Sequence, residues 1–383
     1  MIYSDIQPMH KLRFKGDVYR NEAMSSLMRP FIVDFSVWSD ETSWLACLVK
    51  NIGTNHRIHI ICPDRKTELK VKYALPGEFR NLSVHAHRGE DYSLYADYLI
   101  FYKAQMLGLP EFLLTINSPW QPDDVKVILV GNVRMPNLRV RCQQVRDTYG
   151  SIFDWFYNQN RYPEYFEKDS PYIVHVPLSV WYHMKIFNLF NRMFYENKLV
   201  NLRDDRSHGT NVMGTTYTLL FEPVKGSIQV ARCSPYNLLE AEICIRRIKE
   251  MVRAGIDERR IGVLTTYCGQ KAHIGELDRK RNAISKVFVG ILQDFVDNVY
   301  DYLIISTVET AKRVADGKRY PFDDLLNDKR CFNMALTRGV RHITLLGDPD
   351  MLNGKDTWRQ LIHECDWVEH KDSKQSDLAL PVK

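Results

Sequence analysis

The stretch "VKVILVG" (Val125–Gly131) decides the fold class, because its central four-residue run "VILV" is entirely apolar. A strand of this kind has no polar face, so other parts of the protein must cover both of its faces. Such runs alternate along the chain with amphipathic helical segments, and this alternation indicates parallel sheets. The sequence therefore predicts an α/β fold with open, doubly wound parallel sheets. The other runs are "FIVDF" (31–35), "RIHIIC" (57–62), "ADYLIFY" (96–102), "RIGVLTTY" (260–267), "YDYLIIST" (300–307) and "HITLLG" (342–347).

The length of 383 residues exceeds what one ordinary core needs and suggests two domains. A polar, proline-bearing stretch, "NQNRYPEYFEKDSP" (Asn158–Pro171), separates apolar segments near the middle of the chain. We expect a first domain at residues 29–170 and a second at 171–369. The expected flanks are an N-terminal segment at 1–28 and a flexible tail at 370–383.

Composition excludes several classes of protein. No apolar run approaches the roughly 18 to 20 residues that a membrane helix needs, and the N-terminus lacks the apolar core of a secretory signal. The eight cysteines are scattered without a C-x-x-C pair, which favours reduced packing residues over a zinc site. We therefore expect an intracellular protein, cytoplasmic or nuclear, with no metal, no cofactor and no membrane partner. The net charge of +5 permits nucleic-acid binding without requiring it.

Four stretches of the C-terminal half occur in a particular order. They are "NLLEAEICIRRIKEMVRAG" (237–255), "RIGVLTTYCGQKAHI" (260–274), "YDYLIISTVE" (300–309) and "CFNMALTRGVRHITLLGDPDML" (331–352). Together they resemble the second motor domain of superfamily 1 RNA helicases of the up-frameshift type, the helicases of nonsense-mediated decay and their relatives. The resemblance implies two tandem RecA-like domains of the P-loop NTPase type. It extends over roughly Arg29–Glu369, with too little chain for the accessory barrel and the helical insert of the family, so both are expected to be missing.

Two residues of the second half match functional positions of this family. Arg338, in "FNMALTRG", matches the arginine that reaches the γ-phosphate of ATP, where positive charge stabilises the transition state. Gln270 matches the glutamine of the element "T-P-Y-x-x-Q". The alternative for Arg338 is structural, in that it caps a helix or pairs with a carboxylate.

The phosphate loop of the family, G-P-P-G-T-G-K-T, aligns with "FSVWSDET" and is degenerate here. Phe35, Trp38 and Asp40 replace glycines whose backbone amides approach phosphate, and the two aromatic rings would crowd it. Glu41 replaces the lysine, and only Thr42, the magnesium-binding hydroxyl of the family, is kept. A second interpretation also fits, in which Asp40 or Glu41 starts an ordinary helix, whose N-terminal dipole favours negative charge.

The other nucleotide-contacting positions are altered as well. Tyr102 and Lys103 stand where the family has the two carboxylates that hold Mg²⁺ and polarise water. The remaining changes are Asn132 for an aspartate, Met135 for the glutamine that senses the γ-phosphate, Trp181 for a phosphate-contacting arginine, and Val296 and Asp297 for a Gln-Gly pair. The pattern predicts loss of ATP chemistry, unless the site has been rebuilt or the alignment is out of register.

We therefore expect a catalytically inactive helicase-like protein, not an enzyme, that binds RNA or acts as a scaffold in RNA metabolism. The resemblance suggests surveillance, decay or small-RNA silencing. The alternative is a nucleotide-hydrolysing RNA helicase whose ATP site is rebuilt or completed by a partner.

The expected partners are proteins of an RNA-processing assembly and single-stranded RNA. Candidate RNA contacts are Arg65, Lys66 and Lys271, and the alternative for each is a solvated surface charge. The aromatic stretch "DWFYNQNRYPEYF" (Asp154–Phe166) is either a set of protein-binding anchors or an aromatic cap between two domains.

Overall fold

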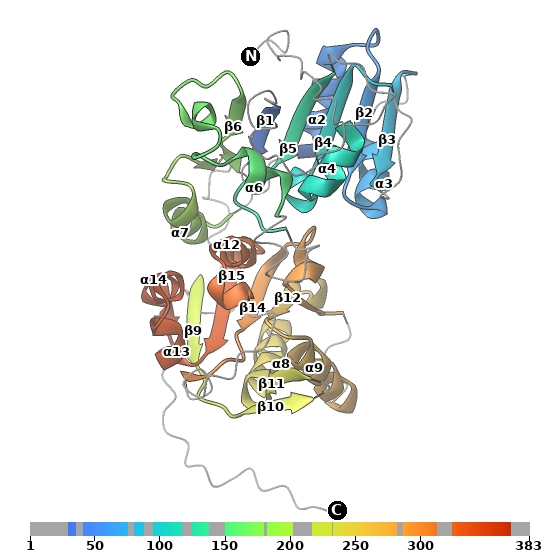
Figure 1. Cartoon of the computed structure of the whole chain (residues 1–383). Coiled ribbons are helices and arrows are strands. Elements are labelled where there is room, and N and C mark those ends of the chain that lie inside the picture. The colour runs from blue at the N-terminus through green and yellow to red at the C-terminus, as the bar shows by residue number, and fades with distance from the viewer. Residues whose placement is uncertain are drawn as a thin grey trace, which may run out of the picture. The chain divides into compact units, whose positions relative to one another are not determined.

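The computed structural model describes residues 30–35, 41–75, 80–87, 95–116, 125–137, 150–179, 182–201, 217–231, 233–281, 286–311 and 324–368. The chain divides into two compact units, drawn from blue to red along the sequence in Figure 1. Unit 1 comprises Met1–Val180 and Lys198–Leu202, and unit 2 comprises Trp181–Asn197 and Arg203–Lys383. No single boundary separates the units, because the chain enters unit 2, returns briefly to unit 1 and then completes unit 2.

Within its described residues, unit 1 has a six-stranded sheet in the order β3-β2-β4-β5-β1-β6, with every neighbouring pair parallel. Its strands are β1 (Phe31–Phe35), β2 (Ile58–Cys62), β3 (Leu82–Ala86), β4 (Tyr98–Tyr102), β5 (Lys126–Gly131) and β6 (Ile173–Val176). Its helices are α2 (Glu41–Ile52), α3 (Arg65–Ala74), α4 (Leu109–Ile116) and α6 (Ile152–Phe156), with 3-10 turns η2 (Ala104–Met106) and η3 (Pro163–Phe166). A short parallel pair, β7 (Leu178–Ser179) and β8 (Val200–Asn201), lies outside this sheet.

Alternating side chains give the sheet of unit 1 two separate cores. Val33 and Phe35 of β1 pack in one core with residues of α2 and α3. Ile32 of the same strand packs in the other core with residues of α4 and α6. Both faces are therefore covered by helices, as an all-apolar strand such as β5 requires.

Unit 2 repeats this plan. Within its described residues a six-stranded parallel sheet has the order β13-β12-β14-β15-β9-β16. Its strands are β9 (Leu219–Pro223), β12 (Ile261–Thr265), β13 (Phe288–Ile291), β14 (Tyr300–Ser306), β15 (Gly339–Gly347) and β16 (Asp366–Trp367), and β10 (Ile228–Ala231) and β11 (Ser234–Asn237) form an antiparallel hairpin. Its helices are α7 (Met184–Phe194), α8 (Leu238–Arg253), α9 (Cys268–Arg281), α11 (Asp324–Asn327), α12 (Lys329–Leu336), α13 (Pro349–Asn353) and α14 (Asp356–Glu364), with η5 (Glu258–Arg260) and η6 (Leu292–Phe295).

Helices also cover the sheet of unit 2. Residues of α8 and α9 share a core with Val263 and Ile304. Leu303 and Leu345, which alternate with that set along their strands, are fully buried too, and α7 and α12 contact β15. The unit is therefore a second doubly wound sheet.

The two sheets have the same topology. When the strands of each are numbered in chain order, both read third, second, fourth, fifth, first, sixth. The predicted α/β class with two doubly wound parallel sheets is confirmed.

Local sequence signals start several of these helices. The side chain of Asp64 accepts a hydrogen bond from the Thr67 amide at 2.8 Å before α3. Asn237 does the same for α8, accepting from the Leu239 and Glu240 amides. Such caps satisfy backbone donors that the first helical turn leaves without a partner.

Three predicted site residues, Trp38, Asp40 and Trp181, lie outside the described residues, as do the segment 1–28 and the tail 370–383. Among the helices that the structure does describe, none is long and apolar enough to cross a membrane.

Candidate functional site

The candidate site lies at the carboxyl edge of the sheet in unit 1, where open α/β sheets bind their ligands. Glu41 and Thr42 open α2, the first helix after β1, and Tyr102 ends β4. The Thr42 hydroxyl lies 3.4 Å from the Tyr102 hydroxyl, which also hydrogen-bonds the Glu41 carboxylate. The structure thus brings together two positions, 42 and 102, that resemble magnesium-binding positions of the family.

Tyr102 is a buried, uncharged group at this point. Its ring packs in the core beneath α2, and burial, followed by the charge of Glu41, raises the pKa of the phenol. A phenol with a raised pKa stays protonated at neutral pH. It can therefore donate or accept a hydrogen bond, but it offers no negative charge to a cation.

Lys103 follows directly, in a backbone conformation that is rare for a residue with a side chain. Its φ of 53° and ψ of 48° lie in the left-handed region, and it precedes η2. Its ammonium acts on the Cys62 thiol at the end of β2, although burial dominates and raises the pKa of that thiol to about 12. Lys103 thus directly follows the carboxyl end of β4.

Phe35, which the alignment placed in the phosphate loop, lies at the end of β1 and is buried. Its ring is 1% exposed and packs edge-on against Trp44 of α2, with ring centroids 5.2 Å apart. The side chain therefore belongs to the core. This placement agrees with the second interpretation of the loop, in which α2 is an ordinary helix.

The positions after β5 are held by backbone contacts. The Asn132 amide donates to Gln105 Oε1 at 3.3 Å, and Asn132 Oδ1 accepts from the Arg134 amide at 2.8 Å. Met135 is buried. A Cβ at Gly131 would lie 2.1 Å from Gln105 Oε1, so a larger residue here would require the Gln105 side chain to shift.

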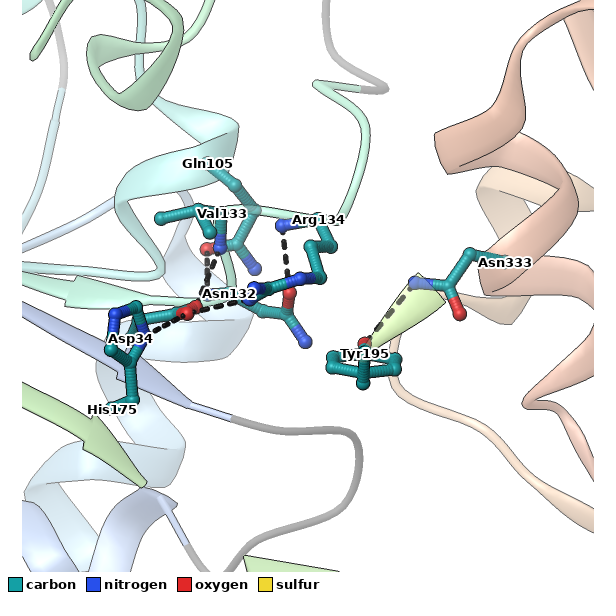
Figure 2. Close-up of polar contacts among 8 residues, drawn as sticks. All are labelled: Asp34, Gln105, Asn132, Val133, Arg134, His175, Tyr195 and Asn333. Atoms are coloured by element: carbon teal, nitrogen blue, oxygen red, sulfur yellow. Dashed lines mark hydrogen bonds and ion pairs between the residues drawn. The ribbon is translucent and has the colours of Figure 1, made fainter. Parts of the chain in front are cut away.

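Asp34, which no sequence motif singled out, organises the same edge (Figure 2). Its Oδ2 accepts from Arg134 Nη1 at 2.7 Å and lies 2.8 Å from His175 Nδ1, while Oδ1 accepts from the Val133 amide at 3.0 Å. The carboxylate side chain is 2% exposed, against 27% for Arg134 and 49% for His175. A carboxylate inside an apolar strand was a usable signal, because a buried charge needs ionic or hydrogen-bonding partners.

In unit 2, Gln270 is at the centre of a fully buried polar network. Its Oε1 accepts from the Asn237 amide at 2.8 Å, and its Nε2 donates to Asn237 O at 3.2 Å and to Ser306 Oγ at 3.1 Å. Ser306 donates in turn to Glu240 at 2.6 Å, and burial raises the pKa of Glu240 to about 8. The network joins α8, α9 and β14, three of the elements that carry the helicase resemblance.

Arg338 is engaged within its own unit. Its Nε donates to Met334 O at 3.0 Å, and its Nη1 donates to the carbonyls of Phe295 and Val296 at 3.2 and 3.1 Å. The guanidinium therefore caps the end of α12 and fixes the turn before Asp297. Two predicted positions, 296 and 338, thus lie in direct contact. The role of Arg338 at a phosphate stays a prediction.

The three candidate RNA contacts differ in their surroundings. Arg65 pairs with Glu68 on α3 and keeps 59% of its side chain exposed, and Lys66 is exposed on the same helix. Lys271 pairs with Asp294 at 2.7 Å in unit 2. Their contact with RNA stays a prediction.

The aromatic stretch 154–166 is mainly core. Phe156, Tyr162 and Tyr165 are at most 2% exposed, and Phe112 packs against Phe156 with centroids 5.3 Å apart. These rings therefore belong to the core of unit 1, and a cap between two domains stays a prediction.

The two residues at the end of β4 are poor ligands for a divalent metal. Mg²⁺ prefers carboxylate, phosphate and water oxygens in octahedral geometry. Here the end of β4 offers a neutral phenol and an ammonium. Within the described residues, no three His, Cys, Asp or Glu side chains come together in a way that could hold a metal ion.

Comparison with known proteins places the second half of the chain among helicases. A family described as "AAA domain" matches residues 164–350. The mouse "5'-3' DNA helicase ZGRF1" is 30% identical over 192 residues, covering 49% of this chain and 10% of that protein. The "ATP-dependent helicase NAM7" of Saccharomyces cerevisiae is 30% identical over 206 residues, covering 49% of this chain and 20% of that protein. The Arabidopsis thaliana "Regulator of nonsense transcripts 1 homolog" is 28% identical over 148 residues, covering 36% and 11%.

These relatives correct one expectation. We expected a protein that is not an enzyme, but the relatives are named as helicases, one of them as ATP-dependent, and helicases are enzymes. The altered nucleotide-contacting positions were therefore an insufficient basis for that expectation. This chain spans between 10% and 20% of the length of the three relatives. By its motifs and by these matches, the chain is similar to the superfamily 1 helicases of the up-frameshift type.

Proposed function

We propose that this chain is a nucleotide-hydrolysing RNA helicase component whose ATP site is completed by a partner protein. The observation that carries the proposal is the contrast between the two units. In unit 2, the Gln270 side chain makes three hydrogen bonds within a buried network, and Arg338 donates to the Val296 carbonyl. Unit 1 has Tyr102 and Lys103 at the positions of the metal-holding and water-polarising carboxylates.

The missing carboxylates explain why a partner is needed. A phosphoryl transfer site depends on metal placement and on a group that positions the attacking water. Neither a neutral phenol nor an ammonium can accept a proton from water at neutral pH. Acidic groups from a second protein would restore both functions without any change in the fold of unit 1.

The proposal places the chain in RNA surveillance, decay or small-RNA silencing inside the cell, in the cytoplasm or the nucleus. Single-stranded RNA is the proposed nucleic acid, with Arg65, Lys66 and Lys271 as candidate contacts. The names of the relatives support this context, since one is a regulator of nonsense transcripts.

The test is RNA-stimulated ATP hydrolysis by the chain alone and by the chain recovered from its source cells with its bound proteins. We expect turnover in the recovered complex only. Arg338→Lys keeps the charge but loses the forked guanidinium, so turnover should fall by about tenfold or more. The control is Arg341→Lys, three residues on, whose arginine pairs with Asp301 at 3.4 Å on the surface.

Two results would count against the proposal. Equal turnover in the wild-type and Arg338→Lys complexes would mean that a contaminating ATPase is being measured. Turnover by the chain alone would mean that unit 1 itself has been rebuilt as the complete site. Hydrogen exchange of α12 would check that Arg338→Lys still folds.

A further inference from the structure

Three of the cysteines that the structure describes are exposed, although the sequence suggested packing residues. Cys47 lies on α2 in unit 1, and Cys233 and Cys268 lie in unit 2. An exposed thiol is open to reagents in solution, whereas a thiol buried in apolar surroundings is inert. The two exposed thiols of unit 2 are therefore available for chemistry.

The fold brings Cys233 and Cys268 to the same place. Cys233 lies in the turn between β10 and β11, with a left-handed φ of 62°, and Cys268 is the first residue of α9. The next residue after each of them is Ser234 and Gly269, and the Gly269 amide donates to Ser234 Oγ at 2.8 Å. This contact joins residues 35 apart in the sequence, and each cysteine is one peptide bond away from it.

The start of α9 packs tightly against β11, and the two elements lie side by side in Figure 1. A Cβ at Gly269 would lie 2.6 Å from the carbonyl oxygens of both Ser234 and Pro235. Because these are backbone atoms, they could not make room without displacing β11. Glycine at this position permits the close approach that keeps the two cysteine-bearing segments together.

We propose that Cys233 and Cys268 form a two-thiol modification site, which a small disulfide such as oxidised glutathione converts into an intramolecular disulfide. One cysteine thiolate attacks a sulfur of oxidised glutathione, which forms a mixed disulfide and releases one glutathione. The other cysteine thiolate attacks the protein sulfur of that mixed disulfide, forms the new bond and releases the second glutathione. The two thiol protons pass to the two glutathione thiolates, and the two electrons reduce the glutathione disulfide.

The new bond joins the same two elements as the buried network of Gln270. Gln270 lies two residues after Cys268 on α9, and its side chain hydrogen-bonds the Asn237 backbone at the end of β11 at 2.8 and 3.2 Å. The disulfide adds a covalent link at the exposed end of this pairing. A covalent link of this kind restricts the unfolded chain, so it holds the two elements together even where the network is weakened.

The experiment is a redox titration of the full chain in mixtures of reduced and oxidised glutathione. Remaining thiols are alkylated, and the chain is cut after glutamates for mass spectrometry, because Glu240 separates Cys233 from Cys244 in the sequence. We expect a Cys233–Cys268 crosslink as the main product, at glutathione ratios where the exposed Cys47 is still a free thiol.

Hydrogen exchange tests the consequence for unit 2. Amides of β11 and of the first turn of α9 should exchange at least about tenfold more slowly in the oxidised chain than in the reduced chain. Gln270→Ala should speed their exchange in the reduced chain, and oxidation should slow it again. Cys233→Ser and Cys268→Ser should each abolish the response to oxidation, whereas the matched control Cys47→Ser should respond as the wild type does.

Three results would overturn the proposal. Separate glutathione adducts on Cys233 and Cys268 without a crosslink would mean that the two sulfurs cannot reach bonding distance. Equal loss of the free Cys47 thiol would mean that exposed thiols react in general. A crosslink without any change in hydrogen exchange would mean that the bond does not hold β11 to α9. None of these measurements depends on ATP hydrolysis, so the proposed function is tested separately.

Discussion

Unit 1 and unit 2 share the order of their six strands but differ in the side chains at the carboxyl edge. The shared backbone features are detailed. The chain turns left-handed after the fourth strand in both units, at Lys103 and at Val308, with φ values of 53° and 67°. The fifth strand ends on glycine in both, at Gly131 and Gly347.

The polar groups at these edges are not shared. Unit 2 joins Asn237, Glu240, Gln270 and Ser306 in a buried network. In unit 1, the buried Asp34 pairs with the half-exposed His175, and the neutral Tyr102 ends β4. The shared topology therefore preserves the backbone at the carboxyl edge of each sheet, and a few side chains determine which chemistry that edge supports.

The largest expected effect comes from the buried glutamines. Gln270→Ala removes three hydrogen bonds and leaves the buried Asn237 amide without its Gln270 acceptor, so unit 2 should lose about 3 to 5 kcal/mol of stability. Gln105→Ala in unit 1 removes the 3.3 Å bond from the Asn132 amide and should cost about 1 to 2 kcal/mol.

Hydrogen exchange of peptides from each unit is the suitable measurement, because a chain with two compact units need not unfold in one step. If Gln270→Ala and Gln105→Ala lowered stability by equal amounts, the expected difference between the buried network of unit 2 and the edge of unit 1 would be wrong.

A smaller effect is expected at the paired glycines. A Cβ at Gly347 would lie 2.2 Å from Thr307 Oγ1, a short side chain fixed by its bond to Leu346 O. A Cβ at Gly131 would meet Gln105 Oε1, the far end of a flexible side chain. Gly347→Ala should therefore cost about 2 to 3 kcal/mol and Gly131→Ala about 1 to 2. Urea unfolding of both variants, followed by hydrogen exchange in each unit, would measure the two losses of stability. A larger loss for Gly131→Ala than for Gly347→Ala would refute the prediction.

The two units should also differ in their response to pH. Burial raises the pKa of Glu240 from 4.5 to about 8, so the folded unit 2 holds a proton that the unfolded chain releases. The contribution of this group to stability is therefore present below pH 4.5 and is lost as the pH rises toward 8. Relative to Glu240→Gln, the wild-type unit 2 should lose stability over that range.

His59 gives unit 1 the opposite response. Burial, followed by the neighbouring His85, lowers its pKa from 6.5 to about 4, and the two rings stack at 5.8 Å. Its contribution is present above pH 6.5 and is lost as the pH falls toward 4. Melting curves of wild type, Glu240→Gln and His59→Gln between pH 4.5 and 8 would check both signs. If a variant and the wild type show the same dependence of melting temperature on pH, the substituted residue does not cause the pH response.

Much of the fold could be predicted from the sequence, because apolar strands and amphipathic helices are local patterns. The run 127–130 has no polar face, so burial on both sides followed directly, and the structure has helices on both faces. The helicase-like motifs of the second half could also be recognised from the sequence, because the residues of each motif are close together in the chain.

Only the tertiary structure decided the chemistry at the edges. Asp34 and His175 are 141 residues apart, and only their pairing across β1 and β6 reveals a charged cluster. Phe35 points into the core, and Arg338 donates to the backbone carbonyls of Phe295 and Val296. Both placements depend on packing that no short sequence motif reveals. The physical reason is that burial, charge pairing and hydrogen bonding act between residues brought together in space. Local patterns were enough to predict the strands, the helices and the resemblance to helicases, whereas packing brought together the side chains that meet at the site.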